Sequence, residues 1–107
     1  MRKTLLAAAL TLIAAGSIAA LADDALVHQK GRAFTVSEVT IKKGATLTFV
    51  NDDTVPHNAI SVTPGSEFNL GSQKPGASTP VTFDQVGDVM VVCAIHPRMK
   101  LTVKVAE

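Results

Sequence analysis

Beyond residue 22, apolar and polar residues alternate along the chain with a period of two, which is typical of β-strands and not of amphipathic helices. Glycines and prolines interrupt this pattern, and they are so frequent in 63–80 that we expect mostly loop there. The pattern predicts strands at 25–29, 34–41, 45–51, 57–62, 81–83, 88–94 and 101–105. Seven short strands with Gly/Pro turns and no helix predict an all-β fold, a Greek-key β-sandwich.

Two of these segments, 34–41 and 45–51, are separated only by the turn KKG at 42–44. A short turn between two alternating segments predicts a β-hairpin with the lysines at its tip. Within the first segment the apolar positions change phase near Ser37 and Glu38. A phase change of this kind predicts a bulge or a bend in the strand.

The first 22 residues have a different character. A basic pair at residues 2–3 precedes an apolar run at 5–15, and small residues follow at 20–22, which is the order found in a secretory signal peptide. The run is shorter than the ~20 residues of a membrane-spanning helix, and this argues against an anchor. We predict cleavage after Ala22, with Ala19 as the alternative, and a mature chain in the periplasm that has no membrane span.

Cleavage leaves residues 23–107, which are enough for one small domain and too few for two. The whole chain has 10 Lys and Arg against 9 Asp and Glu, and two of the basic residues lie in the leader. Nucleic acid is therefore not an expected partner, because phosphate binding needs a basic face. The one cysteine cannot form an internal disulfide. Its thiol can pair between molecules, lie inert in the core or bind a metal, which would also stabilise so small a domain.

That cysteine lies in the stretch VVCAIHPRMK (91–100), where His96 and Met99 follow Cys93 at intervals of three. In the predicted strand 88–94, Cys93 shares its face with alternate valines and points toward the core. The chain must then turn if the three side chains are to meet, because His96 would face the other side of a continuing strand. Alone, a cysteine or a methionine is more often core packing than a ligand. Their joint spacing favours a metal site.

Two further histidines are available to complete such a site. His57 follows the segment NDDTVP at the start of a predicted strand, whereas His28 lies near the mature N-terminus and is expected to be solvated. Asp52 and Asp53, within the same segment, are expected to form a solvated turn. Two imidazoles, a thiolate and a thioether suit a copper site for electron transfer, because soft sulfur donors favour copper. Zinc would recruit more thiolates or carboxylates.

The sequence CAIHPRM resembles the Cys-x2-His-x2-Met ligand loop of amicyanin-like cupredoxins, the methylamine-utilisation type of blue copper protein. VNDDTVPHNAISV and VTIKKGATLTFVN are similar to the family's first-histidine segment and its preceding hairpin, so the resemblance covers essentially the whole mature chain. It implies one type 1 copper ion with His57, Cys93 and His96 as equatorial ligands. It also implies Met99 as the long axial ligand, and Asn58 as the residue that ties the ligand segments together and hydrogen-bonds toward the sulfur.

Two positions depart from the pattern of the relatives. Val91 stands where an aromatic residue is common, and Arg98 places a positive charge in the ligand loop. The resemblance implies that His96 is the ligand nearest the surface, where electrons would leave through an apolar patch. The charge of Arg98 beside this patch is expected to influence which redox partner binds, and Arg98 touches no ligand.

The resemblance implies a soluble electron carrier that cycles between Cu(I) and Cu(II), and a monomer is the default expectation. Its partners would be a redox protein donor and acceptor, such as a c-type cytochrome or a periplasmic dehydrogenase. A periplasmic copper chaperone or storage protein is the alternative, although a single core-facing cysteine favours retention of the metal over its exchange. An enzyme is not expected, because a second, catalytic copper would need its own histidines and only His28 remains.

Overall fold

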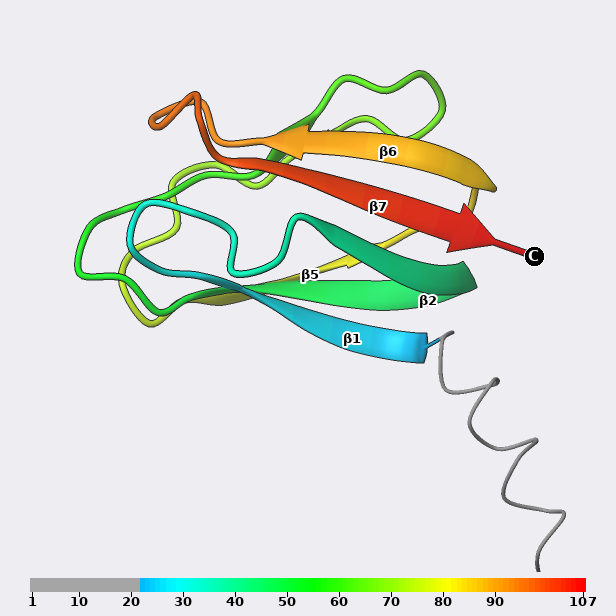
Figure 1. The fold of residues 1–107 in the computed structure, drawn as a ribbon, viewed down its shortest axis with the longest axis horizontal. Coiled ribbons are helices and arrows are strands. Elements are labelled where there is room, and N and C mark those ends of the chain that lie inside the picture. The colour runs from blue at the N-terminus through cyan, green and yellow to red at the C-terminus, as the bar shows by residue number, and fades with distance from the viewer. Residues whose placement is uncertain (1–21) are drawn as a thin grey trace, which may run out of the picture.

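A computed structural model describes residues 22–107, and the described part of the chain consists of strands and loops (Figure 1). The strands are β1 (Ala22–Gln29), β2 (Glu38–Asn51), β3 (Ile60–Ser61), β4 (Phe68–Asn69), β5 (Ser78–Thr82), β6 (Gly87–Val92) and β7 (Lys100–Ala106). Their hydrogen-bonded order is β1-β2-β7-β6-β3-β4, with β5 paired to β2, and the predicted all-β fold is confirmed. None of the described residues forms a helix long and apolar enough to cross a membrane. The predicted signal peptide, apart from Ala22, lies outside the described residues.

The long strand β2 belongs to both layers of the sandwich. Its first part, 38–42, pairs with β7 in parallel. Its second part, from Thr46 onward, pairs with β1 in parallel and with β5 in antiparallel orientation. Gly44 lies between the two parts with a φ of 89°, a left-handed conformation that glycine adopts without steric cost, and the strand bends there. In Figure 1, β6 and β7 accordingly lie above β1, β2 and β5.

The predicted hairpin of 34–41 with 45–51 is therefore wrong. The two halves of β2 continue one another and pair with different strands, and a local pattern of alternation does not reveal these distant partners. The phase change near Glu38 marks the beginning of β2. Phe34, which precedes it, forms only an isolated bridge with Gln29.

The remaining strands differ from the prediction mainly at their ends. The segment 57–62 contributes only the two residues of β3, and His57 forms an isolated bridge with Gln73. The stretch 63–80 is mostly loop, as predicted, but it contains β4 and the first residues of β5. Pro80 is tolerated in β5 because, in the part of the chain that the structure describes, this strand pairs with β2 alone and is an edge strand.

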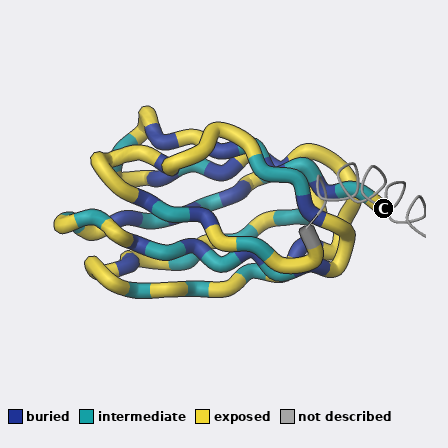
Figure 2. The backbone as a smooth tube through the Cα atoms, turned by 60° about the horizontal axis from the view of Figure 1, so that its bottom comes forward, coloured by how far each residue is buried: buried dark blue, intermediate teal, exposed yellow. Residues whose placement is uncertain are grey.

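Alternate residues of both layers point inward and form one apolar core, so that buried and exposed positions alternate along the strands (Figure 2). The largest buried apolar side chains are Phe49, Phe83, Ile41, Leu47, Met99 and Leu101. On β6 and just beyond it, Val89, Val91 and Cys93 are buried while Met90 is half exposed, as the alternation predicts. The core therefore extends to the two sulfur-containing side chains, those of Cys93 and Met99.

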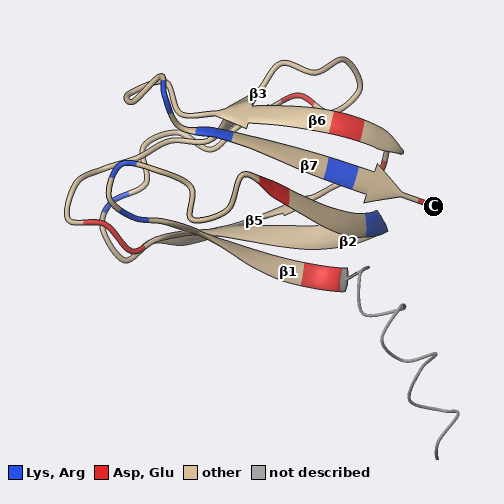
Figure 3. Ribbon diagram, viewed as in Figure 1, with Lys and Arg blue, Asp and Glu red and all other residues tan. Residues whose placement is uncertain are grey.

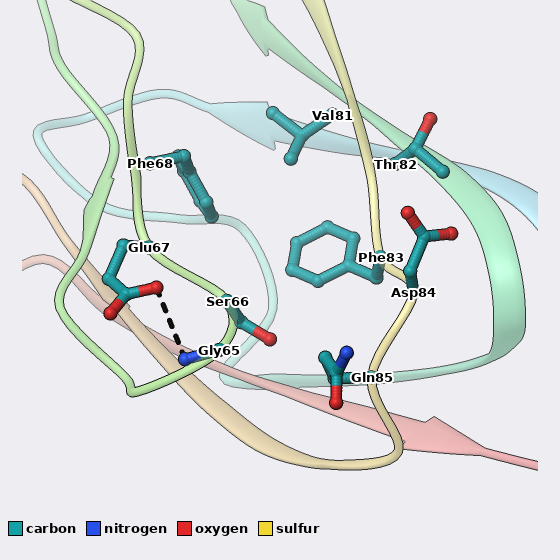
Figure 4. A pocket seen from close by; sticks show the side chains of 9 residues that line it. All are labelled: Gly65, Ser66, Glu67, Phe68, Val81, Thr82, Phe83, Asp84 and Gln85. Atoms are coloured by element: carbon teal, nitrogen blue, oxygen red, sulfur yellow. Dashed lines mark hydrogen bonds between the residues drawn. The ribbon is translucent and has the colours of Figure 1, made fainter.

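A pocket opens between the loop 65–68 and the segment 81–85 (Figure 4). In it the rings of Phe68 and Phe83 meet edge to face, with centroids 5.8 Å apart. The carboxylate of Glu67 accepts a hydrogen bond of 3.1 Å from a main-chain N–H of its own loop. None of the lining residues is a metal-ligand candidate, so the pocket is a feature separate from the site described next.

Candidate metal centre

The loop from Cys93 to Met99 joins β6 to β7 at one end of the sandwich (Figure 1). The N–H of Met99 donates to the carbonyl oxygen of His96 at 2.9 Å, and the N–H of Cys93 donates to the carbonyl oxygen of Met99 at 3.3 Å. The loop thus closes on itself in a compact turn, as the spacing predicts. Cys93 and Met99 are each 1% exposed, whereas His96 is partly exposed.

His57 reaches this loop from a different part of the chain. Its side chain is fully buried, and its Nδ1 lies 3.1 Å from Nδ1 of His96. One donor atom from each of His57, Cys93 and His96 lies within 4.8 Å of the other two. The fold therefore brings together three of the four predicted ligands in an arrangement that can hold a metal ion.

Asp53 fixes the orientation of the His57 ring. Nε2 of His57 lies 2.8 Å from Oδ2 of Asp53 and donates to it, which leaves the Nδ1 lone pair free to face the cluster. The same carboxylate accepts hydrogen bonds from the N–H groups of Arg32 at 2.8 Å and Thr54 at 2.9 Å. These two bonds and the His57 ring hold the pKa of Asp53 well below its ordinary value.

The expectation that Asp53 belongs to a solvated turn is therefore wrong. Its side chain is only 11% exposed, and it acts on a candidate ligand. The signal available in the sequence was an acidic residue four positions before a candidate histidine. The two side chains meet only because the turn between them brings Asp53 back onto the ring of His57, and the sequence pattern does not reveal this turn.

A frame of hydrogen bonds holds the backbone of the His57 segment. The N–H of His57 donates to the carbonyl of Gln73 at 3.0 Å, and the N–H of Gln73 donates back to the carbonyl of His57 at 2.7 Å. The buried Asn51 side chain donates to the carbonyls of Val55 at 3.0 Å and Gln73 at 2.9 Å. Its oxygen accepts the N–H of Asp53 at 2.9 Å. Sequence reasoning missed both Asn51 and Gln73, because the local pattern does not distinguish these polar side chains from others until the segments that carry them have packed together.

Asn58 connects the two ligand segments through its main chain. Its N–H lies 3.3 Å from Sγ of Cys93 and donates to the sulfur. Its side-chain amide instead points to Asn69, with Nδ2 3.4 Å from the Asn69 oxygen. A hydrogen bond to a cysteine sulfur draws electron density from it and fixes its direction.

His28 and Met99 are the other two candidates considered from the sequence. His28 lies outside the cluster and contacts the carboxylate of Asp52 at the surface, so it is paired as well as solvated. Met99 is buried in the core at the base of the ligand loop. It brings a thioether to the same end of the molecule as the thiol of Cys93.

The chemistry of these donors fits copper. A thiol and two imidazole nitrogens, with a thioether in the same loop, combine soft and borderline donors. A structural zinc site is normally built from thiolates and imidazoles without a thioether. A two-layer β-sandwich with such a cluster at one end defines a protein of the cupredoxin class.

The chain belongs to the plastocyanin/azurin family of copper binding proteins, whose sequence profile matches residues 22–106. Copper is accordingly its cofactor, and the predicted resemblance to cupredoxins is confirmed. A search among curated proteins gave no match.

Three of the solved structures with the same fold have chains of different length, so the aligned share of each chain differs. Amicyanin from Paracoccus versutus is 30% identical, with 78% of this chain and 82% of amicyanin aligned and a TM-score of 0.69. A purple cupredoxin from Nitrosopumilus maritimus is 25% identical over 78% of this chain and 100% of its own, with a TM-score of 0.69. The copper-containing nitrite reductase from Thermus scotoductus is 26% identical, with a TM-score of 0.73. The alignment covers 78% of this chain but only 22% of the reductase.

Proposed function

We propose that the protein is a copper-dependent electron carrier in which His57, Cys93 and His96 are the strong copper ligands and Met99 is the weak axial one. The observation that carries the proposal is the convergence of a thiol and two imidazoles within 4.8 Å of one another. Copper bound at this point supplies a one-electron couple between Cu(I) and Cu(II). The family match and the likeness to amicyanin support the same function.

The residues around the candidate ligands favour rapid electron transfer, because they leave little to rearrange. Asp53 orients the His57 ring, and the paired hydrogen bonds with Gln73 hold its backbone. The Asn58 N–H directs the sulfur of Cys93. Donors already held in position need not move when the charge of the metal changes, so the energetic cost of reorganisation is small.

His96 provides the path by which an electron would leave. Unlike His57, it is partly exposed, and Ile95 beside it is 50% exposed. An apolar contact around a partly exposed ligand allows a partner to approach the metal closely without displacing any donor. We propose this face as the point of electron exchange.

Two other functions are weaker on specific grounds. A chaperone must give up its metal, whereas Cys93 is buried and its neighbours hold it in place. The likeness to the copper-containing nitrite reductase covers only 22% of that chain, so it gives no support for catalysis by this protein. Within residues 22–107, His57, Cys93 and His96 form the one group of three potential metal donors. We therefore propose a carrier without catalysis of its own.

We further propose that residues 1–22 are a signal peptide that directs the chain to the periplasm. Residues 23–107 would then form the single mature domain, active as a monomer. Its donor and acceptor would be redox proteins of the same compartment, such as a c-type cytochrome or a dehydrogenase. The N-terminal sequence of the exported protein, read by mass spectrometry, tests the cleavage position.

The carrier function is tested by two measurements: whether the protein retains copper, and whether the bound copper can be reduced and reoxidised. The copper-loaded protein is dialysed against a moderate chelator, then reduced with ascorbate and reoxidised with hexacyanoferrate(III). A carrier keeps its copper and recovers its full visible spectrum over repeated cycles. Loss of copper to the chelator would favour a chaperone, and failure to cycle would contradict the proposal.

A further inference from the structure

A hollow beside His96 is built from two segments that are far apart in the sequence. It is lined by Gly31, Arg32, Ile95, His96, Pro97 and Arg98. The apolar side chains come from the ligand loop, and each of the two segments contributes one arginine. The partly exposed candidate ligand therefore lies in an apolar hollow that carries a cation from each side.

The acidic groups at this end of the molecule form no ion pair with either of the two arginines. In Figure 3 one acidic stretch lies near the basic segments at the end where β6 leads into β7. Asp52 in this stretch contacts His28, and Asp53 is turned inward to His57. None of the ion pairs found among residues 22–107 involves Arg32 or Arg98. Their charges are therefore available to a partner.

The backbone of Arg32 is tied to the metal site by the side chain of Asp53. Arg32 has a φ of 57°, the one positive value for a non-glycine residue among those described. Its main-chain N–H donates to the carboxylate of Asp53, and the turn that contains Arg32 is closed by a hydrogen bond of 2.9 Å from the N–H of Lys30 to the carbonyl of Ala33. A left-handed arginine costs about 1 kcal/mol or more, so the surrounding contacts must hold this loop. The main chain that carries this cation is thus held on the same frame that orients His57.

We propose that this hollow is the docking surface for a redox protein whose contact face is acidic, with Arg32 and Arg98 pairing with its carboxylates and Ile95 and Pro97 packing against its apolar centre. The inference rests on the proposed carrier function and adds the chemistry of the partner to it. Complementary charges steer encounter and set orientation, whereas the apolar centre permits close contact. An acidic partner is favoured because both flanks of the hollow carry positive charge.

The experiment uses an acidic and a basic c-type cytochrome as electron acceptors for the reduced copper protein. Arg98→Glu removes one flank, and Lys43→Glu is its matched control, because it makes the same charge change at the exposed bend of β2. Arg32→Asn tests the other flank independently, since asparagine tolerates the left-handed conformation, and Lys43→Asn is its control. Second-order rate constants are measured by stopped flow at several ionic strengths, with the visible spectrum and reduction potential of each variant.

The wild type should reduce the acidic cytochrome faster than the basic one, and this rate should fall as salt increases. Arg98→Glu should lower the rate with the acidic cytochrome by about tenfold and flatten its salt dependence. Arg32→Asn should lower this rate by a smaller factor. Lys43→Glu and Lys43→Asn should each lower the rate less than the arginine variant for which it is the control. The docking surface would be overturned if the Lys43 controls lost as much of the rate constant as the arginine variants, or if the wild type reduced the basic cytochrome faster. In either case an unchanged copper spectrum and reduction potential would still show a working carrier. A wild type without a reversible potential would overturn both proposals.

Discussion

The carboxylate of Asp53 determines which nitrogen of His57 faces the candidate metal centre. Because Nε2 donates to this carboxylate, the free lone pair is on Nδ1, the atom that lies 3.1 Å from Nδ1 of His96. At the scale of single residues, the site therefore depends on a side chain that is not itself a ligand.

Replacement of Asp53 by alanine should weaken copper binding by about 10- to 100-fold, because the His57 ring loses the carboxylate that orients it. The neighbouring Asp52→Ala is the control, since Asp52 contacts only the exposed His28 among the described side chains. Competition with a chelator of known affinity measures both variants. If Asp53→Ala bound copper as tightly as Asp52→Ala, the positioning role of Asp53 would be wrong.

Replacement of Met99 by glutamine should retain copper but lower the reduction potential. An amide oxygen is a harder donor than a thioether and stabilises Cu(II) relative to Cu(I). Met90→Gln is the control, because Met90 is half exposed on the outer face of β6. Voltammetry of the three proteins measures the difference. An unchanged potential in Met99→Gln would remove Met99 from the proposed ligand set.

The ligand candidates could be predicted from the sequence because most of the information is local. Cys93, His96 and Met99 lie in one loop, and a family resemblance adds His57. The roles of Asp53 and Gln73 could not be predicted in this way. They arise from hydrogen bonds that form only after the loops that carry them have packed together.

At the scale of elements, β2 is the strand that connects the two layers. Its first part pairs with β7 and its second with β1 and β5, so the bend between them sets how the layers lie on one another. Alternation of apolar residues predicted that these segments are strands. It could not predict their partners, because pairing is decided between residues distant in sequence, and a turn with glycine resembles the tip of a hairpin.

Gly44→Ala should destabilise the protein by about 1–2 kcal/mol, because alanine in a left-handed conformation brings its Cβ too close to the backbone. The cost is local, since a Cβ at this position meets no atom within 4 Å other than those of residue 44 and its two chain neighbours. Gly44→Asn should cost less, and Lys43→Ala should cost little. Urea unfolding of the metal-free variants measures these differences. A Gly44→Ala variant as stable as the wild type would contradict the requirement for a left-handed residue at this bend.

At the scale of the whole molecule, one apolar core joins the layers and extends to the candidate metal centre. The single cysteine is free and buried, so the domain has no internal disulfide. Cohesion therefore depends on core packing, on strand pairs distant in sequence and on the metal when it is bound. Charged groups whose pKa changes on folding add a dependence on pH.

Asp53 should make the metal-free protein more stable at neutral than at acid pH. Its pKa is lowered in the folded state by the N–H groups of Arg32 and Thr54 and by His57, so folding favours the ionised form. This contribution is complete above the ordinary carboxyl pKa of about 4 and is lost as the pH falls below it. The difference in unfolding free energy between the wild type and Asp53→Asn should shrink over that range. A difference independent of pH would contradict the shift.

Titration of the metal-free protein with Cu(II), followed by visible absorption, tests the central claim most directly. The account predicts an intense visible band that saturates at one copper per chain, because the Cys93 thiolate binds the ion together with two imidazoles. It predicts no such band for Cys93→Ala. A wild type that stays colourless with excess Cu(II), or a Cys93→Ala variant that keeps the band, would contradict it.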